Sequence, residues 1–338
     1  MSHRTSVRTW LEAAAAGSAL LLVGVPSAGA DQRETPAEHE VAAADAAAAE
    51  AYWTPERMRA AAPADVPAAE RAAAPSPVAS GTPRAIPGHG PQAGRDRGDQ
   101  GSGNGQGHGQ VQGGGHGNGP DRASAEAPVP HIGKVFFTLG GQDYVCSGNA
   151  VVSGNESTVA TAGHCVNEGP GEFATRWIFV PAYDNGNAPY GEWAATSLLA
   201  PSAWTDQGDI SHDTGFAVVD SEEGSTLTDT VGASGVAFNQ PTGEFYTAYG
   251  YPAASPYDGQ SLVSCAGQAG PDPYGQSDSQ GIECDMTGGS SGGPWFLGTD
   301  SSGMQNSVNS FGYTDVPGTM FGPYWGSAIE ETYLTAQE

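Results

Sequence analysis

A glycine-rich run near the carboxyl end of the chain contains a serine that could act as a nucleophile. Residues 287–294 read Thr-Gly-Gly-Ser-Ser-Gly-Gly-Pro, and an apolar stretch follows Ser291 closely. A serine that attacks an amide needs an exposed hydroxyl, and backbone N–H groups must point at the oxygen that becomes negative. Glycines permit this, since no side chain obstructs the substrate. We therefore predict Ser291 as the nucleophile, and the N–H groups of Gly289 and Ser291 as the oxyanion hole.

A serine hydroxyl is a weak nucleophile without a neighbouring base, and the sequence offers a histidine and an acid in suitable surroundings. His164 lies in the segment Thr-Ala-Gly-His-Cys at the end of an apolar run. We predict it to be the general base that takes the serine proton. Asp213 comes just before the apolar run 216–219, where its carboxylate could accept the N–H of His164 and fix its tautomer.

Three nearby residues are alternatives for these roles. Asp206 and Asp209 could replace Asp213, but neither directly precedes a strand-like run. His212 could be mistaken for the base. Because neighbours on a strand point to opposite faces, we expect His212 at the surface.

The elements that would position these residues are short strands. Apolar or alternating runs bounded by Gly, Pro, Asn or Asp predict strands over 132–139, 144–152, 158–162, 177–180, 216–219 and 245–249. Strands of this length without a long helical period indicate an all-β sandwich or barrel of roughly 200 residues. One short terminal helix is predicted over 328–334.

These motifs together resemble the trypsin-like (chymotrypsin-fold) serine peptidases. The Thr-Ala-Gly-His-Cys segment, the acid before a strand and the Gly-Gly-Ser-Ser-Gly-Gly-Pro segment stand in the family's order of His, Asp and Ser. The resemblance covers residues 131–338 and implies two packed six-stranded antiparallel β-barrels with the triad in the cleft between them. It also implies that Ser310, Phe311 and Gly312 pair with the substrate backbone as an added strand.

The departures from the family pattern concern activation and specificity. Ser290 stands where trypsin-like enzymes usually have the Asp that pairs with a freed N-terminal amine, so that activation mechanism is not expected. The chain is more similar to the secreted bacterial branch, including the glutamyl-endopeptidase-like group. Asp285, six residues before Ser291, has the spacing of the acid that binds Lys or Arg in tryptic enzymes. A glutamyl preference would need a basic or histidine environment, and Asn309 precedes Ser310, so specificity stays open.

The four cysteines lie inside the predicted peptidase domain, and an even number in an exported chain indicates two disulfides. Of three possible connectivities we favour Cys146 with Cys165 and Cys265 with Cys284. Each would close a loop of about 20 residues, which contributes roughly 3 kcal/mol in the chain-entropy picture. A metal site is disfavoured because no Cys-x-x-Cys pair occurs.

The N-terminal third differs in composition from the rest. A signal peptide is predicted over residues 1–30, because two arginines are followed by an apolar run over 13–25 and by small residues at 28–30. The apolar run is shorter than the ~20 residues that span a bilayer, which disfavours a membrane anchor. Residues 31–80 are Ala/Pro-rich and are interpreted as a weakly structured pro-segment with one short helix within 56–62. Residues 81–130 are Gly-rich and are predicted to be a disordered linker.

Charge and composition narrow the possible partners. Of 12 Lys and Arg residues ten precede residue 131, whereas 24 Asp and Glu residues follow it. Nucleic acid is therefore excluded as a partner. The sequence predicts a secreted, monomeric serine endopeptidase that acts on protein or peptide substrates without cofactor or metal and matures from a zymogen. The alternative is an inactive barrel that serves as a cell-envelope binding module, because a fold alone does not establish activity.

Overall fold

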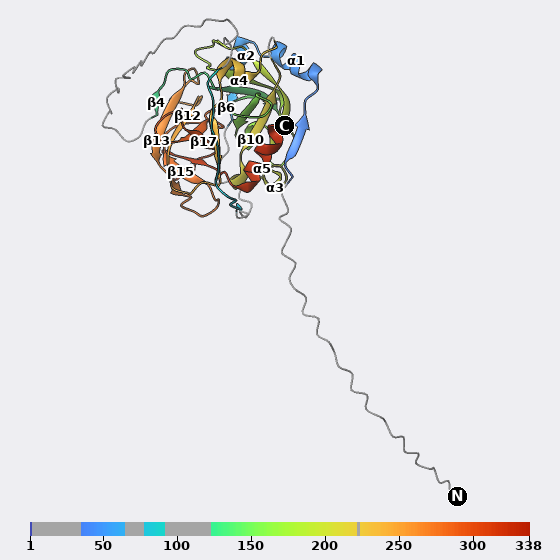
Figure 1. The fold of residues 1–338 in the computed structure, drawn as a ribbon, viewed down its shortest axis with the longest axis vertical. Helices are drawn as coiled ribbons and strands as arrows, with labels where there is room; N and C mark the ends of the chain where they lie inside the picture. Colours follow the sequence, from blue (N-terminus) through green and yellow to red (C-terminus); the bar gives the residue numbers. More distant parts are fainter. Residues whose placement is uncertain (2–34, 65–77, 92–122, 222–223) are drawn as a thin grey trace, which may run out of the picture. The chain divides into compact units, whose positions relative to one another are not determined.

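The structure is a computed structural model, and it describes residues 1, 35–64, 78–91, 123–221 and 224–338. Apart from Met1, the predicted signal peptide lies outside the described residues. The regular secondary structure of the described chain is mainly β-strand, with a few short helices (Figure 1). None of its helices has both the length and the apolar character that a membrane crossing requires.

Six antiparallel strands in the first half of the domain close into a barrel. They are β5 (Ile132–Leu139), β6 (Gln142–Val151), β7 (Thr158–Thr161), β8 (Thr175–Pro181), β9 (Trp193–Ala200) and β10 (Gly215–Val219). The ring order is β5, β6, β7, β10, β9 and β8, and β8 pairs again with β5. The predicted all-β class and the six-stranded barrel are confirmed.

Strand β5 is an almost continuous apolar run because both of its faces are buried. Val135 and Phe137 pack in one apolar cluster, whereas Phe136, between them, packs in another. Successive side chains of a strand point to opposite faces, so the two clusters lie on either side of β5. The cluster around Phe136 includes Tyr249 and Phe296 from the second half of the domain. Strand β5 therefore helps to join the two halves.

The strands of the second half form two sheets. The larger contains β11 (Gly235–Phe238), β12 (Phe245–Gly250), β13 (Val263–Gln268), β16 (Pro294–Leu297) and β17 (Met304–Val308), with β3 (Arg84–Ile86) and β4 (Ser124–Ala125) at its edges. The smaller contains β14 (Gly270–Pro271), β15 (Gln280–Glu283) and β18 (Thr319–Gly322). The Cys265–Cys284 disulfide links the two sheets.

The helices are short and lie between or after the strands. Those that follow residue 131 are η2 (Gly163–Cys165), α3 (Ser202–Gln207), η3 (Ile210–His212), α4 (Leu227–Val231) and α5 (Ser327–Ala336). The predicted terminal helix corresponds to α5, which buries Ile329 and Tyr333 in the same cluster as Val135. All six predicted strand runs overlap observed strands, namely β5, β6, β7, β8, β10 and β12.

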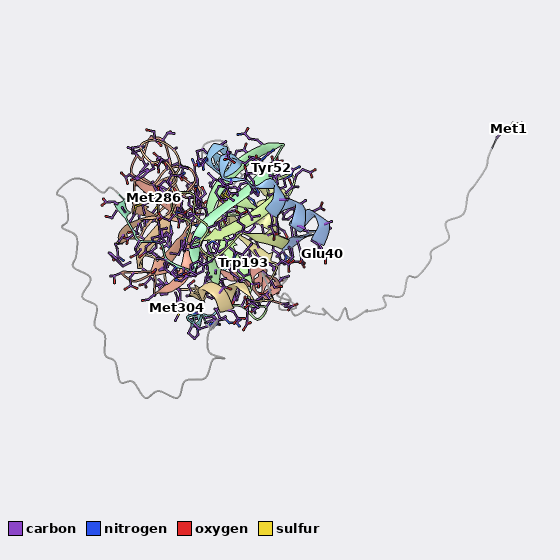
Figure 2. The ribbon with its side chains drawn as sticks, turned by 90° about the horizontal axis from the view of Figure 1, so that it is seen from above. Met1, Glu40, Tyr52, Trp193, Met286 and Met304 are labelled. Carbon is purple, nitrogen blue, oxygen red and sulfur yellow. A yellow bond between two sulfur atoms is a disulfide. The ribbon has the colours of Figure 1, made fainter. Side chains whose placement is uncertain are left out.

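Part of the N-terminal region that was expected to be weakly structured is folded onto the first barrel. It comprises β1 (Ala37–Glu40), α1 (Ala43–Tyr52), α2 (Pro55–Ala60), which matches the predicted short helix, and β2 (Ala62–Pro63). The reason is an apolar stripe at helical spacing, since Ala46, Ala49 and Trp53 are all buried. Figure 2 shows this segment along the first barrel, with Glu40 and Tyr52 labelled.

The predicted linker, 81–130, is also partly ordered. Strand β3 pairs with β11 and strand β4 pairs with β13, so the two ends of the linker extend the second-half sheet. The part between them, 92–122, lies outside the described residues. The expectation of disorder therefore does not hold for residues 84–86 and 124–125, because edge strands offer them backbone partners.

Candidate active site

The helical turn η2 positions His164 immediately after strand β7. Cys165, the next residue, forms a disulfide with Cys146 on the neighbouring strand β6, which holds the turn against the barrel. The backbone N–H of His164 donates to Asp213 Oδ1 over 2.8 Å, and His164 Nδ1 lies 2.8 Å from Asp213 Oδ2. An ionised carboxylate can only accept, so Nδ1 carries the proton and Nε2 is available as a base.

Asp213 is completely buried between η3 and β10. Burial raises the pKa of its carboxyl, but the electrostatic interaction with His164 and the hydrogen bonds from His164 and Ser310 outweigh burial and lower the pKa overall. The Ser310 hydroxyl donates to Asp213 Oδ2 over 2.5 Å. Asp213 is therefore an ionised group whose acceptor positions are taken by His164 and Ser310.

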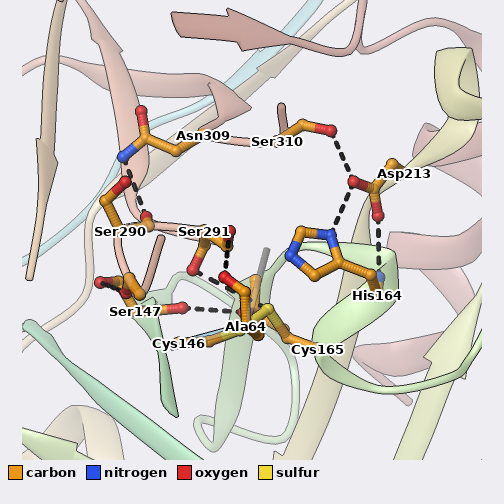
Figure 3. The surroundings of a disulfide bond; sticks show 12 residues. Ala64, Cys146, Ser147, His164, Cys165, Asp213, Ser290, Ser291, Asn309 and Ser310 are labelled. Atoms are coloured by element: carbon orange, nitrogen blue, oxygen red, sulfur yellow. Dashed lines mark hydrogen bonds and ion pairs between the residues drawn. A yellow bond between two sulfur atoms is a disulfide. The ribbon is translucent and has the colours of Figure 1, made fainter. Parts of the chain in front are cut away.

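The loop that carries Ser291 is shaped by two glycines with positive φ. Gly289 has φ of 93° and Gly292 has φ of 80°. A Cβ on Gly292 would lie 2.1 Å from Thr161 Oγ1, so only glycine fits there. The loop is tied to strand β6, because Ser147 N donates to Ser291 O over 2.7 Å and Ser147 Oγ donates to Gly289 O over 3.0 Å (Figure 3).

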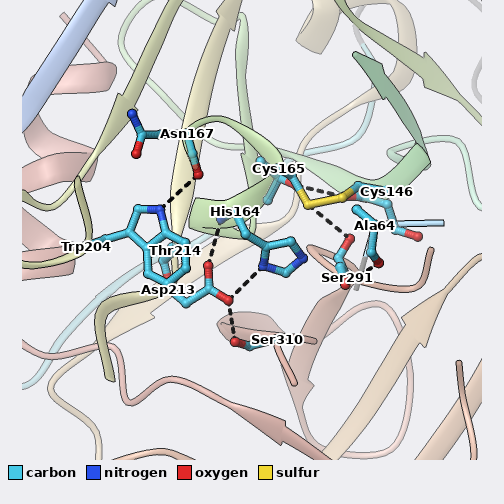
Figure 4. Close-up of polar contacts among 12 residues, drawn as sticks. Ala64, Cys146, His164, Cys165, Asn167, Trp204, Asp213, Thr214, Ser291 and Ser310 are labelled. Atoms are coloured by element: carbon cyan, nitrogen blue, oxygen red, sulfur yellow. Dashed lines mark hydrogen bonds and ion pairs between the residues drawn. A yellow bond between two sulfur atoms is a disulfide. The ribbon is translucent and has the colours of Figure 1, made fainter. Parts of the chain in front are cut away.

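The imidazole of His164 lies between Asp213 and Ser291 (Figure 4). His164 Nε2 is buried and has no hydrogen-bond partner among the described residues. The Ser291 hydroxyl instead donates to the carbonyl oxygen of Ala64 over 3.4 Å, and Gly289 N donates to the same oxygen over 3.1 Å. The three predicted triad residues are thus brought together, with the serine hydroxyl directed at a carbonyl from the N-terminal region.

Comparison with known proteins places this arrangement in a family. No family model matches the chain. The structure of Protease Anisep from Arthrobacter nicotinovorans is 59% identical, with a TM-score of 0.62, over 64% of this chain and 99% of that one. The thermostable serine protease AL20 from an extremophilic microorganism is 55% identical, with a TM-score of 0.60, over 62% of this chain and 97% of that one. The chain belongs to the trypsin-like serine peptidases.

Two other matches give weaker support for the family assignment. A Glu endopeptidase structure, 20% identical with a TM-score of 0.51, shows the shared fold. A curated protein of Bacillus subtilis (strain 168), named extracellular metalloprotease, is 31% identical over 84 residues, and the chain spans 26% of its length. Among the described residues the group that could hold a metal is Cys146, His164 and Cys165, but both sulfurs are in a disulfide. These residues do not fit a metal centre, because ligation needs thiolates.

A pocket of this trypsin-like peptidase opens beside Ser291, with a volume of about 180 Å³. Ser310, Phe311 and Gly312 line it. Their pairing with the substrate backbone stays a prediction. Its other lining residues are Met286, Thr287, Gly288, Ser290, Tyr313, Thr314, Thr319 and Met320. None of the lining side chains carries a charge.

Asp285 is not brought into this pocket. Its carboxylate accepts from Ala123 N over 2.6 Å and from the Tyr257 hydroxyl over 2.8 Å. The spacing of Asp285 from Ser291 matched that of tryptic enzymes, but the pocket lining begins at the next residue, Met286. The sequence position alone did not determine the direction of the side chain.

The residues considered as alternatives for the triad, His212, Asp209 and Asp206, do not take part in the contacts between His164, Asp213 and Ser291. His212 was expected at the surface, but it lies in η3 and is 4% exposed. A one-turn helix replaces the expected strand there, so the alternation of faces does not apply. Its Nδ1 is 3.4 Å from Asp209 Oδ2, while Asp209 also accepts from Ser211 N. Asp206 is exposed.

Two side chains that the sequence did not reveal hold the nucleophile loop. Asn309 Nδ2 donates to Ser290 O over 3.0 Å and to Tyr249 O over 2.8 Å. Ser147, on β6, provides the two bonds to the loop described above. Both act on backbone atoms that are distant in sequence, and no motif marks such contacts.

Proposed function

We propose that this chain hydrolyses internal peptide bonds by acyl transfer to Ser291. The Ser291 oxygen attacks the substrate carbonyl while His164 Nε2 takes the hydroxyl proton. The N–H groups of Gly289 and Ser291 stabilise the negative oxygen of the tetrahedral intermediate. His164 then gives its proton to the leaving amine, and water, activated by the same base, releases the acyl group.

The observation that carries this proposal is the His164–Asp213 pair beside Ser291. Asp213 accepts both the backbone N–H and the ring Nδ1–H of His164, at 2.8 Å each. The pair fixes the ring plane and favours the tautomer with a free Nε2. Its orientation toward Ser291 supports a role as the proton carrier rather than a structural role (Figure 4).

We further propose that the pocket beside Ser291 binds an uncharged substrate side chain. A charged side chain in a confined site needs a partner of opposite charge, and none lines this pocket. Asp285 is directed to Ala123 N and Tyr257 instead. The two disulfides and the apolar run in the predicted signal peptide support export from the cell. The domain has few basic residues, so it offers no positively charged surface to which nucleic acid could bind.

The test uses the processed protein, from which the N-terminal pro-segment has been removed, and its Ser291→Ala variant in the same processed form. Each is treated with a fluorophosphonate probe and then with a denatured protein mixture, whose cut sites are read by mass spectrometry. We expect labelling and cleavage that the variant loses, with cuts after uncharged residues. A folded, processed protein that neither labels nor cleaves would instead favour the cell-envelope binding module.

A further inference from the structure

The described N-terminal segment, residues 35–64, is anchored on the first barrel at several places. Strand β1 pairs with β9 in register from Ala37 with Ala200 to Glu40 with Ser197. Trp53 is 3% exposed, and its ring N–H donates to Arg176 O over 2.6 Å. Met58 and helix α1 pack in the same apolar cluster as Trp53. We call residues 35–64 the strap.

The end of the strap lies in the catalytic cleft. Strand β2 pairs in parallel with β6, and Ala64 N donates to Val145 O over 3.0 Å. The Ala64 carbonyl oxygen accepts from Gly289 N over 3.1 Å and from Ser291 Oγ over 3.4 Å. The Ala64 side chain is 6% exposed. One backbone carbonyl thus occupies both the proposed oxyanion donor and the proposed nucleophile.

We propose that the strap is a built-in inhibitor of the peptidase, with Ala64 as its blocking residue. This inference rests on the proposed function, and it deepens that function by naming the contact that blocks it. A substrate carbonyl must reach Gly289 N and Ser291 Oγ, and the Ala64 carbonyl holds both. The Ser291 hydroxyl is also turned to an acceptor other than His164 Nε2, which is left without a partner in the described structure.

The strap occupies the cleft in the direction opposite to a substrate. In a substrate, the residues before the scissile carbonyl pair with Ser310, Phe311 and Gly312, by the resemblance on which those residues were predicted. The residues before the Ala64 carbonyl pair with Tyr144 and Val145 of β6 instead. No hydrogen bond joins residues 62–64 to 310–312 within the described chain. The Ala64 carbonyl therefore blocks the site without being presented for cleavage.

Anchoring and blocking are carried by different residues, which allows them to be tested separately. Trp53 packs against Phe136, with ring centroids 5.5 Å apart, on the outer face of the barrel. Loss of such a buried indole weakens the anchor without changing an atom of the triad. Ala64 forms the blocking contact, and an aspartate there would place a charge in a buried position beside Ser291.

The experiment measures how fast a fluorophosphonate probe labels Ser291 in the intact full-length chain. Trp53→Ala and Ala64→Asp are compared with wild type and with Ala44→Asp, which adds the same charge at an exposed position of the strap. We expect Trp53→Ala to raise the labelling rate by on the order of a hundredfold, because losing a packed tryptophan shifts a closed-to-open equilibrium by about that factor. Ala64→Asp should raise the rate as well, and Ala44→Asp should leave it unchanged.

The outcomes separate this inference from the proposed function. If intact wild type labels as fast as both variants, and all of them cleave substrate, the strap does not inhibit and only this inference fails. If neither the processed protein nor any variant labels, although each shows a cooperative thermal unfolding transition, the proposed function fails. After the strap has been removed by processing, all variants should share one kcat/KM, which guards against a folding defect.

The direction of the strap is tested on the same samples. Wild type is incubated until it is processed, and its new N-termini are identified by mass spectrometry. We expect no cut after Ala64, because the chain that precedes it runs along β6. An N-terminus at Asp65, formed by wild type but not by Ser291→Ala, would overturn the reversed arrangement.

Discussion

The two halves of the domain hold their parts of the active site in different ways. In the first half, His164 and Asp213 bond directly to each other, and Cys165 ties the histidine turn to Cys146. In the second half, the Ser291 hydroxyl has its hydrogen bond to a residue of the strap, and its loop is tied to the first half. The proposed proton-handling pair is thus preassembled, whereas the proposed nucleophile depends on contacts from outside its own half.

The two disulfides sharpen the same contrast. Both join cysteines 19 residues apart, so both restrict the unfolded chain equally. Cys146–Cys165 adjoins His164, and the Cys165 sulfur lies 3.8 Å from the Ser291 carbonyl oxygen. Cys265–Cys284 lies in a separate apolar cluster with Tyr246 and Trp295. The two disulfides should therefore contribute equally to stability, whereas only Cys146–Cys165 should contribute to catalysis.

The largest effect is expected from breaking the preassembled pair with Asp213→Asn. The amide cannot accept from both His164 N–H groups as a carboxylate does, so the ring is no longer held in the productive tautomer. We expect kcat/KM to fall by about ten-thousandfold. Peptide hydrolysis by the processed enzyme measures it, and Asp206→Asn, at an exposed rival position, should retain full activity. A loss of equal size in Asp206→Asn would remove the assignment of Asp213.

Removing each disulfide in turn tests the second contrast. Cys146→Ala with Cys165→Ala and Cys265→Ala with Cys284→Ala should each lower the free energy of unfolding by about 3 kcal/mol. Only the first pair should lower kcat, because it frees the turn that carries His164 from β6. Denaturant unfolding and steady-state kinetics give the two quantities. Equal kcat values in both double variants would show that the disulfide beside His164 does not position it.

The residues of the proposed triad, which the structure brings together, and the strands of the first barrel could be recognised because their signals are local. His164 and Ser291 stand in motifs of small residues, and strands such as 132–139 have clear boundaries. Asp213 was identified by its place before strand β10, although the residues just before it form the one-turn helix η3 and not the strand expected at His212. The disulfide connectivity was one of three possibilities, and the observed pairing is the favoured one.

The strap could not be predicted, because its order comes from contacts distant in sequence. The Ala-rich composition of residues 31–80 indicated weak structure, yet Trp53 finds its partner at Arg176 and Ala64 finds its partners at Val145 and Gly289. The expected place of Asp285 in the specificity pocket was not found for a related reason. Its direction depends on Ala123 and Tyr257, which no local pattern connects to it.

A smaller effect is expected from Ser310, which joins the second half to the pair in the first. Ser310→Ala removes the hydroxyl that donates to Asp213 Oδ2 and so raises the pKa of Asp213. A hydrogen bond to a charged group contributes enough that kcat/KM should fall by roughly tenfold. Because Asp213 acts as an anion, lowering the pH should abolish the activity of Ser310→Ala at a higher pH than that of the wild type. Ser310→Thr should restore the wild-type pH profile, and an unshifted acid limb in Ser310→Ala would contradict this role.

The smallest effect concerns Lys134, whose amine on β5 donates to Gly259 O of the second half over 2.8 Å. Burial lowers the pKa of Lys134 from 10.5 to about 7, although Asp258 opposes the shift. Below pH about 7 the amine is charged in both states, and the full cost of burying the charge is present. As the pH rises further, the folded amine is neutral while the unfolded one still binds a proton, so the free energy of unfolding increases.

This gain should amount to about 1.4 kcal/mol per pH unit between pH about 7 and about 10. Lys134→Met keeps the apolar length of the side chain but cannot titrate, so its free energy of unfolding should lack this slope. Urea unfolding at several pH values, in a Ser291→Ala background that prevents self-digestion, measures the difference. Parallel pH profiles for the two proteins would mean that the amine stays charged where the two halves meet, and that this contact tolerates a buried cation.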